Sequence, residues 1–179
     1  IATLFSSYAN TTGGTVLFGV KESGKAVGVS PQSLIDDIKY ALSEFGMNDI
    51  EWAHKQLMQG RHLFIEVIIS RGGNKLAIQN RGSKEYYCRI RDKTIIANKI
   101  ILKVWSLEEG RSEPKELDEL EDEIDLLIKD NRNVSLAFLY RKLVDKNSRI
   151  EIALSQLIYK NRVRVAWKND ELKYSSVNI

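Results

Sequence analysis

The chain has 179 residues, of which 43% are hydrophobic and 28% are charged, and its formal net charge is +3. This is the composition of a globular protein of one or two domains, and the mild positive charge is compatible with a nucleic-acid partner. One cysteine, Cys88, excludes an internal disulfide and indicates a reducing compartment, so we predict a cytoplasmic protein. One cysteine and two histidines are too few for a Cys/His zinc site, and no apolar run is long enough to span a membrane.

Helical spacing of apolar residues predicts a short helix over residues 1–9. Because this pattern starts at the first residue, which is not methionine, we expect further residues upstream. Asn10 favours a turn, and Gly13 and Gly14 can adopt positive φ, so they are expected to end the helix before a buried strand at 16–20. A second interpretation is that the bare N–H groups of these glycines bind a phosphate or another anion.

Strand patterns dominate the rest of the first half. A hairpin turn at 22–25 and a returning strand at 26–29 are followed by a helix that Ser30 and Pro31 begin and Gly46 ends. The pattern indicates an α+β domain with a mixed, mainly antiparallel sheet, which we assign to residues 1–106. Its remaining predicted elements are strands at 50–57, 62–69 and 84–90, and a helix capped by Thr94 that carries Ile95, Ile96, Ile100, Ile101 and Val104.

A polar segment that contains a glycine and a proline predicts a linker over 107–116. Beyond it, three helical patterns are followed by a strand hairpin. Ser135 is expected to cap the second of these helices, and Ser148 with Glu151 has the spacing of a capping box at the start of the third. This order of elements is typical of a winged helix-turn-helix domain, which we assign to 117–179; an unrelated small helical bundle is the alternative.

The run from Tyr8 to Val20, YANTTGGTVLFGV, resembles the signature of the Schlafen AlbA-like domain. Three later segments resemble further elements of that family, and the resemblance covers roughly residues 1–105: AVGV at 26–29, EYYCR at 85–89 and TIIA at 94–97. Bacterial members often precede a winged helix and are described as DNA-binding transcriptional regulators, so the resemblance implies that role here. It also implies that Asn10, Gly13 and Gly14 belong to a ligand-facing edge.

The same resemblance raises an enzymatic alternative. Some Schlafen proteins are ribonucleases that use a cluster of carboxylates, as is needed to hold a divalent metal ion between phosphate oxygens. The strand that carries two of these carboxylates is not found in this sequence, and Lys21 occupies another candidate position, which leaves Glu22 alone. We therefore predict no catalytic residue, metal or cofactor, and keep a metal-dependent nuclease or a nucleotide-binding protein as the alternative function.

Charge is segregated within the predicted winged helix. Acidic residues cluster between Asp118 and Asp125, whereas the residues after them are mainly basic. Phosphate contacts supply most of the affinity for DNA, and contacts with base edges supply specificity. We predict that the third helix meets the major groove and that the hairpin contacts phosphates, through Arg149, Ser155, Gln156 and Tyr159 on the helix and Arg162, Arg164 and Lys168 on the hairpin.

In the first half, Arg89 and Arg91 fall on one face of a strand by the period of two. We predict that they contact a phosphate backbone, together with Lys21 and the turn at Asn10; the alternative for each is a structural or solvated side chain. The predicted partner is double-stranded DNA, with RNA as an alternative, bound by a homodimer because winged-helix regulators commonly read paired half-sites. A third hypothesis is an interaction module whose winged helix mediates dimerisation.

Overall fold

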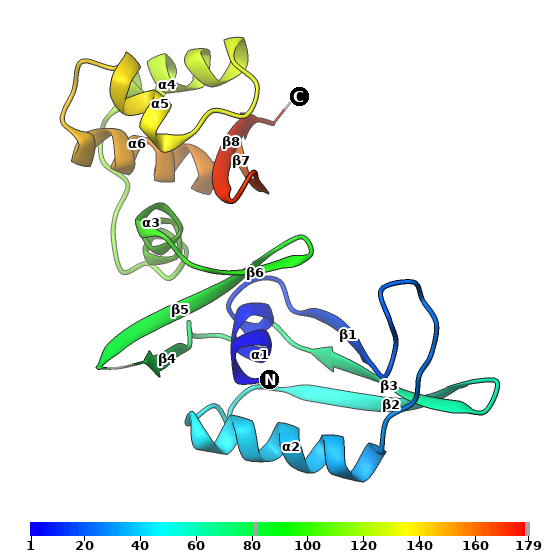
Figure 1. Ribbon diagram of the computed structural model, residues 1–179. Helices are drawn as coiled ribbons and strands as arrows, with labels where there is room; N and C mark the ends of the chain where they lie inside the picture. The colour runs from blue at the N-terminus through cyan, green and yellow to red at the C-terminus, as the bar shows by residue number, and fades with distance from the viewer. Residues whose placement is uncertain (81, 178–179) are drawn as a thin grey trace. The chain divides into compact units, whose positions relative to one another are not determined.

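The computed structural model describes residues 1–80 and 82–177 (Figure 1). Its secondary structure is mixed α+β with antiparallel sheets, as predicted. The chain divides into two compact units: the first contains residues 1–89 and 94–96, and the second contains residues 90–93 and the chain from Ala97 onward. No helix in the described part of the chain is long and apolar enough to cross a membrane.

The first unit is built on a three-stranded antiparallel sheet with the strand order β1-β3-β2. In its register Val16, Val67 and His54 lie in one row across the three strands. The predicted end of the second helix at Gly46 is confirmed, since this residue has a φ of 64° directly after the C-terminal cap of the helix. The elements are α1 (Ala2–Ala9), β1 (Gly14–Phe18), α2 (Pro31–Glu44), β2 (Trp52–Gln59) and β3 (His62–Ile69).

Both helices of the first unit contribute to its core. Phe5 of α1 and Ile38 of α2 are fully buried, and they share one cluster with Ile65 and Ile69 of β3. Phe5 also meets the ring of Trp52 edge-on, with 5.9 Å between the ring centroids. Buried residues alternate along β3, which is the period of a strand with one covered face.

A second sheet has the strand order β4-β5-β6. Its strands are β4 (Ala77–Asn80), which the sequence pattern did not indicate, β5 (Ser83–Ile90) and β6 (Lys93–Ile96). The predicted helix cap at Thr94 is wrong, because the β-branched run around it forms β6. The helix starts later, as α3 (Lys99–Glu108), and Asn98 caps it: its Oδ1 accepts the N–H groups of Ile100 and Ile101, both at 3.0 Å.

The second unit contains the predicted order of three helices and a hairpin. Ser135 is confirmed as a cap, since its Oγ accepts the Phe138 N–H at 3.2 Å. The turn of the hairpin contains Asn169 and Asp170, both with positive φ, as a two-residue hairpin turn requires. The elements after α3 are α4 (Asp118–Asp130), α5 (Leu136–Lys142), α6 (Asn147–Tyr159), β7 (Val163–Lys168) and β8 (Glu171–Ser176).

Helix α3 groups with the second unit, whereas the predicted boundary after residue 106 would place it in the first. Ile100 of α3 is fully buried in the cluster that contains Leu154 of α6. In addition, Lys99 Nζ lies 2.6 Å from Glu151 Oε1. The predicted capping box is wrong for the same reason: the carboxylate of Glu151 accepts hydrogen bonds from Lys99 and Tyr140 instead of turning back to the start of α6.

Candidate nucleic-acid interface

The side chain of Asn10, in the turn after α1, is bound inside the fold. Asn10 is fully buried. Its Nδ2 donates to the carbonyl oxygens of Leu76 at 2.8 Å and Tyr87 at 2.9 Å, and its Oδ1 accepts the Leu76 N–H at 2.6 Å. These three bonds attach the β4–β5 hairpin to the end of α1. The prediction that Asn10 faces a ligand is corrected, because no part of this side chain is exposed.

Other parts of the chain approach Gly13 and Gly14, in the same turn, too closely for a side chain to fit. Gly13 has a φ of 70°, and a Cβ there would lie 2.6 Å from the Ile69 carbonyl oxygen. A Cβ on Gly14 would lie 2.5 Å from the ring of Tyr8. The Gly13 N–H is donated to the Tyr8 carbonyl oxygen at 2.9 Å, so this group already has its partner. The geometry therefore fits the interpretation of a turn that only glycine fits, and it gives no support to an anion site at Gly13.

Arg89 and Arg91 do not form the predicted stripe. Arg89 Nη1 donates to Thr94 Oγ1 at 2.9 Å, and its guanidinium lies 5.1 Å from the centroid of the Tyr8 ring. Arg91 has a φ of 55°, so it belongs to a turn where the alternation of a strand has ended. Lys21 is exposed in the turn that follows the first strand. These three basic residues therefore have different roles: Arg89 binds Thr94 and the Tyr8 ring, whereas Arg91 and Lys21 lie in turns.

Helix α6 is covered on the side that was predicted to face DNA. Ser155 and Gln156 are buried, at 1% and 0% exposure, which corrects their predicted place on the outer side of the helix. Gln156 Oε1 accepts the Lys115 N–H at 2.7 Å, and its Nε2 donates to the Lys115 carbonyl oxygen at 3.0 Å and to Glu121. With α3 also packed on α6, the middle of this helix has no free polar side to present to bases.

The remaining residues around α6 that were predicted to contact DNA differ in exposure and in their ion pairs. Tyr159 is 42% exposed at the end of the helix. Arg149 is about half exposed and pairs with Asp145 at 3.1 Å. Arg162 is held on α4 instead of projecting from the hairpin, because its Nη2 lies 2.7 Å from Asp125 and 3.0 Å from Asp122. Hydrogen bonds to these two carboxylates raise the pKa of Arg162, so its charge is permanent but already compensated.

Arg164 and Lys168 meet two further basic residues in a groove. We call this the hairpin groove; it has a volume of about 510 Å³ and lies between the end of α4 and the β7–β8 hairpin. Arg164 Nε donates to Ser175 Oγ at 3.0 Å, and Lys168 Nζ donates to Asn133 Oδ1 at 2.9 Å. None of the described residues that line the groove is acidic: Ile128, Lys129, Arg132, Asn133, Arg164, Lys168, Ser175 and Ser176.

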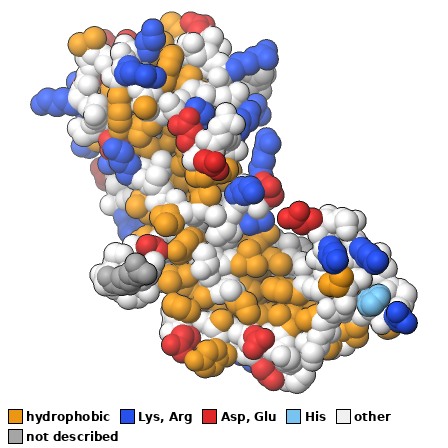
Figure 2. Space-filling view, viewed as in Figure 1, with side chains coloured by type: hydrophobic (Ala, Val, Ile, Leu, Met, Phe, Trp, Pro, Cys, Tyr) orange, Lys and Arg blue, Asp and Glu red, His pale blue; other side chains and the backbone are white. Residues whose placement is uncertain are grey.

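Lys129 and Arg132 were missed at the level of the sequence. Lys129 lies in the last turn of the acidic helix α4 and Arg132 follows that helix, so both stand next to a run of Asp and Glu. Lys129 pairs with Asp125 at 3.0 Å, and the pKa of Asp125 lies below its usual value: burial acts to raise it, but hydrogen bonds from Lys129 and Arg162 outweigh burial. Basic side chains are also prominent on the face of the second unit seen in Figure 2. The excess of basic residues after Asp125 is the feature of the sequence that could have indicated Lys129 and Arg132.

A protein-family model described as Schlafen, AlbA_2 matches residues 1–98. The chain belongs to the Schlafen AlbA_2 family. No curated protein and no solved structure matches it. Membership of the Schlafen AlbA_2 family supports nucleic-acid binding as the general function. Within the described residues there is no group of three or more His, Cys, Asp or Glu side chains that could hold a metal ion.

Proposed function

We propose that this Schlafen AlbA_2 protein is a DNA-binding transcriptional regulator whose second unit works as a winged helix. The observation that carries the proposal is the hairpin groove, which is lined by four basic side chains, one of them (Lys129) paired with Asp125, and by no acidic residue among the described lining residues. Phosphate oxygens are the ligands that such a set of cations favours. The order of α4, α5, α6, β7 and β8 supports the winged-helix assignment, with the hairpin as the wing.

The groove offers donors as well as charge. Arg132 is exposed at the end of α4, and the guanidinium of Arg164 can bind a phosphate with two parallel hydrogen bonds. Lys168 supplies a point charge, and its contact with Asn133 uses one of its three donors. Ser175 adds a hydroxyl to the lining of the same groove. These groups suit a backbone that passes along the wing.

In this winged helix, the middle of α6 does not read bases. The buried Ser155 and Gln156 take the middle of α6 out of the interface, so affinity comes from the backbone contacts of the wing. Arg149, at the exposed start of α6, is the residue of that helix best placed to approach a base edge. A homodimer would supply a second wing and a second half-site.

The covered face of α6 favours interaction as a second candidate function. Glu151 has 8% exposure and binds both Lys99 and Tyr140, so the polar face of α6 serves contacts within the second unit. In that case the second unit is a structural or dimerisation module. A Schlafen-type nuclease receives less support, because Glu22 lies in an exposed turn and the described residues hold no metal-ligand cluster.

The test is binding of the full chain to mixed-sequence duplex DNA across a salt series, with EDTA present. Removal of two phosphate contacts by the double variant Arg132→Gln/Arg164→Gln should lower the slope of log affinity against log salt by about 1.8. Arg141→Gln is the matched control, because Arg141 is exposed on α5 outside the groove. Absence of duplex binding at low salt would reject the proposal and leave the interaction module.

A further inference from the structure

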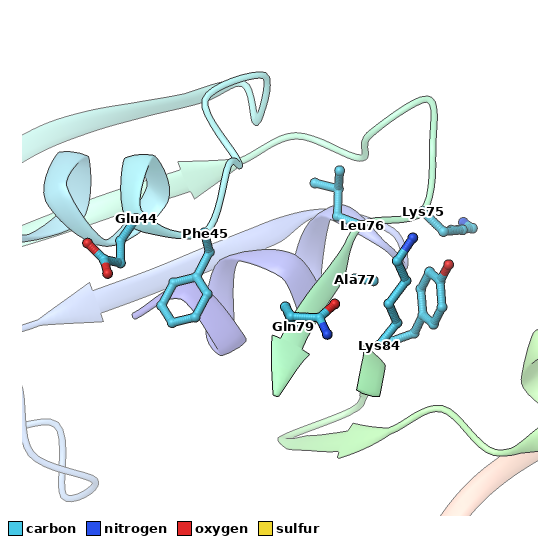
Figure 3. A pocket seen from close by; sticks show the side chains of 8 residues that line it. Glu44, Phe45, Lys75, Leu76, Ala77, Gln79 and Lys84 are labelled. Atoms are coloured by element: carbon cyan, nitrogen blue, oxygen red, sulfur yellow. The ribbon is translucent and has the colours of Figure 1, made fainter. Parts of the chain in front are cut away.

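A second cavity, of about 470 Å³, lies in the first unit between the end of α2 and the β4–β5 hairpin (Figure 3). Lys75 and Lys84 lie toward one end of the cavity, and Phe45 and Glu44 lie toward the other, with Gln79 between them. Its volume is within the range of small-molecule sites. The cavity therefore has a cationic end and an aromatic end, separated by an amide.

The hairpin presents its part of the lining in register. Gln79 is paired with Lys84 across β4 and β5, and Ala77 is paired with Tyr86. Because side chains alternate along a strand, these four residues share one face of the hairpin. That face is the wall of the cavity, so the position of Lys84 and Gln79 follows from the strand pairing rather than from a flexible loop.

The signature turn of the family supports the cationic end. Lys75 Nζ donates to the backbone oxygen of Asn10 at 2.8 Å, and the side chain of Asn10 binds the N–H and the carbonyl oxygen of Leu76. This bond fixes the position of the Lys75 ammonium group at the cationic end of the cavity. Asn10 therefore fixes the positions of Lys75 and Leu76, which line this part of the cavity.

The aromatic end has a side chain that the core does not use. Phe45 caps the end of α2 and is 44% exposed. Aromatic side chains beside basic ones are the usual components of sites for single-stranded nucleic acid, where a base stacks on the ring and the backbone follows the cations. Glu44 lies beside Phe45 and repels phosphate there, which sets the direction of a bound nucleotide.

We propose that this cavity holds one nucleotide of a single-stranded nucleic acid. The base stacks on Phe45, the amide of Gln79 offers both a donor and an acceptor to the base edge, and the phosphate lies at Lys75 and Lys84. The site belongs to the first unit alone, so it does not depend on the proposed binding of duplex DNA by the hairpin groove.

The experiment uses the full chain and a short fluorescein-labelled oligo(dT), followed by anisotropy across a salt series. Phe45→Ala should weaken binding roughly tenfold, since one stacked base is lost. Lys84→Gln should lower the salt slope by about 0.7, the value for one phosphate contact on a single strand. The matched controls are Tyr40→Ala and Lys39→Gln, two exposed residues of α2 that do not line the cavity and should leave binding unchanged.

The outcomes separate this site from the hairpin groove. If Phe45→Ala and Lys84→Gln bind oligo(dT) as the unaltered chain does, the inference is overturned. It is also overturned if Arg132→Gln/Arg164→Gln removes single-strand binding and Lys84→Gln does not, because the strand would then lie in the groove. Loss of oligo(dT) binding in the cavity variants with no duplex binding by any form would support the cavity and reject the groove. Urea unfolding of each variant shows whether the fold is kept.

Discussion

Replacement of Asn10 by alanine is the change for which the structure gives the most definite expectation. The side chain makes three hydrogen bonds, at 2.6, 2.8 and 2.9 Å, and has no exposed surface. Asn10→Ala leaves the N–H and carbonyl oxygen of Leu76 and the carbonyl oxygen of Tyr87 without these partners. An unsatisfied buried polar group costs about 1–3 kcal/mol, so the three together should lower the free energy of unfolding of the first unit by at least about 3 kcal/mol.

Native-state hydrogen exchange measures this loss in each unit separately. In Asn10→Ala, amides of β3 that exchange by unfolding of the first unit should exchange roughly a hundredfold faster, which is the equivalent of 3 kcal/mol. Amides of α6 report on the second unit and should change little, because the three side-chain hydrogen bonds of Asn10 are made with Leu76 and Tyr87 of the first unit. Asn74→Ala is the matched control, since Asn74 is exposed in the segment before β4.

One result would refute the reasoning. If Asn10→Ala leaves the exchange of β3 unchanged but abolishes nucleic-acid binding, the side chain acts on a ligand, as the sequence had predicted. Asn10→Asp sharpens the comparison, because it keeps the shape but turns a carboxylate toward two carbonyl oxygens. It should therefore destabilise the first unit as much as alanine or more, since it adds a buried charge to the lost donors.

Two further predictions concern the turn and the α3–α6 contact. Gly13→Ala should destabilise the first unit by about 2 kcal/mol or more in urea unfolding. The control is Gly24→Ala, which should cost about 1 kcal/mol, because Gly24 has a similar φ of 79° but open space around it. Equal costs would contradict the close-approach argument. The pKa of Glu151 lies below its ordinary 4.5, because hydrogen bonds from Lys99 and Tyr140 outweigh the burial that raises it. Its stabilising effect is therefore complete above pH 4.5 and is lost as the pH falls through the lower folded-state pKa. In acid titrations of stability, Glu151→Gln should flatten that loss; a loss of the same steepness in this variant would contradict the assignment.

The order of elements was readable from the sequence because it depends on local periodicity. The helices α1, α2 and α4 and the paired strands β2 and β3 lie close to their predicted ranges, since apolar residues recur at the helical or the strand period along each of them. The end of a helix was less readable. Thr94 has the chemistry of a cap, but the run of β-branched residues at 94–96 places it in a strand and leaves the cap to Asn98.

The predicted site was less accurate than the predicted elements because a polar side chain does not show its partner in the sequence. Gln156 was expected to face solvent from the pattern of α6, yet it binds the backbone of Lys115, 41 residues away. Arg162 was expected to project from the hairpin, yet it lies against the acids of α4. In both cases the acidic helix or the connecting segment offered a partner that no local window contains.

Composition and local periodicity thus determined the α+β class and the sequence of helices and strands, and the run of residues from Tyr8 to Val20 carried the resemblance to the family. The tertiary structure decided which partners the polar residues bind. Asn10 belongs to the signature turn in the sequence, but it acts on Leu76, 66 positions later, and so fastens a hairpin instead of meeting a ligand. Lys129 and Arg132 are ordinary surface residues until β7 brings Arg164 and Lys168 beside them. Long-range pairing of this kind depends on how the chain closes its loops, which the local pattern of residues does not encode.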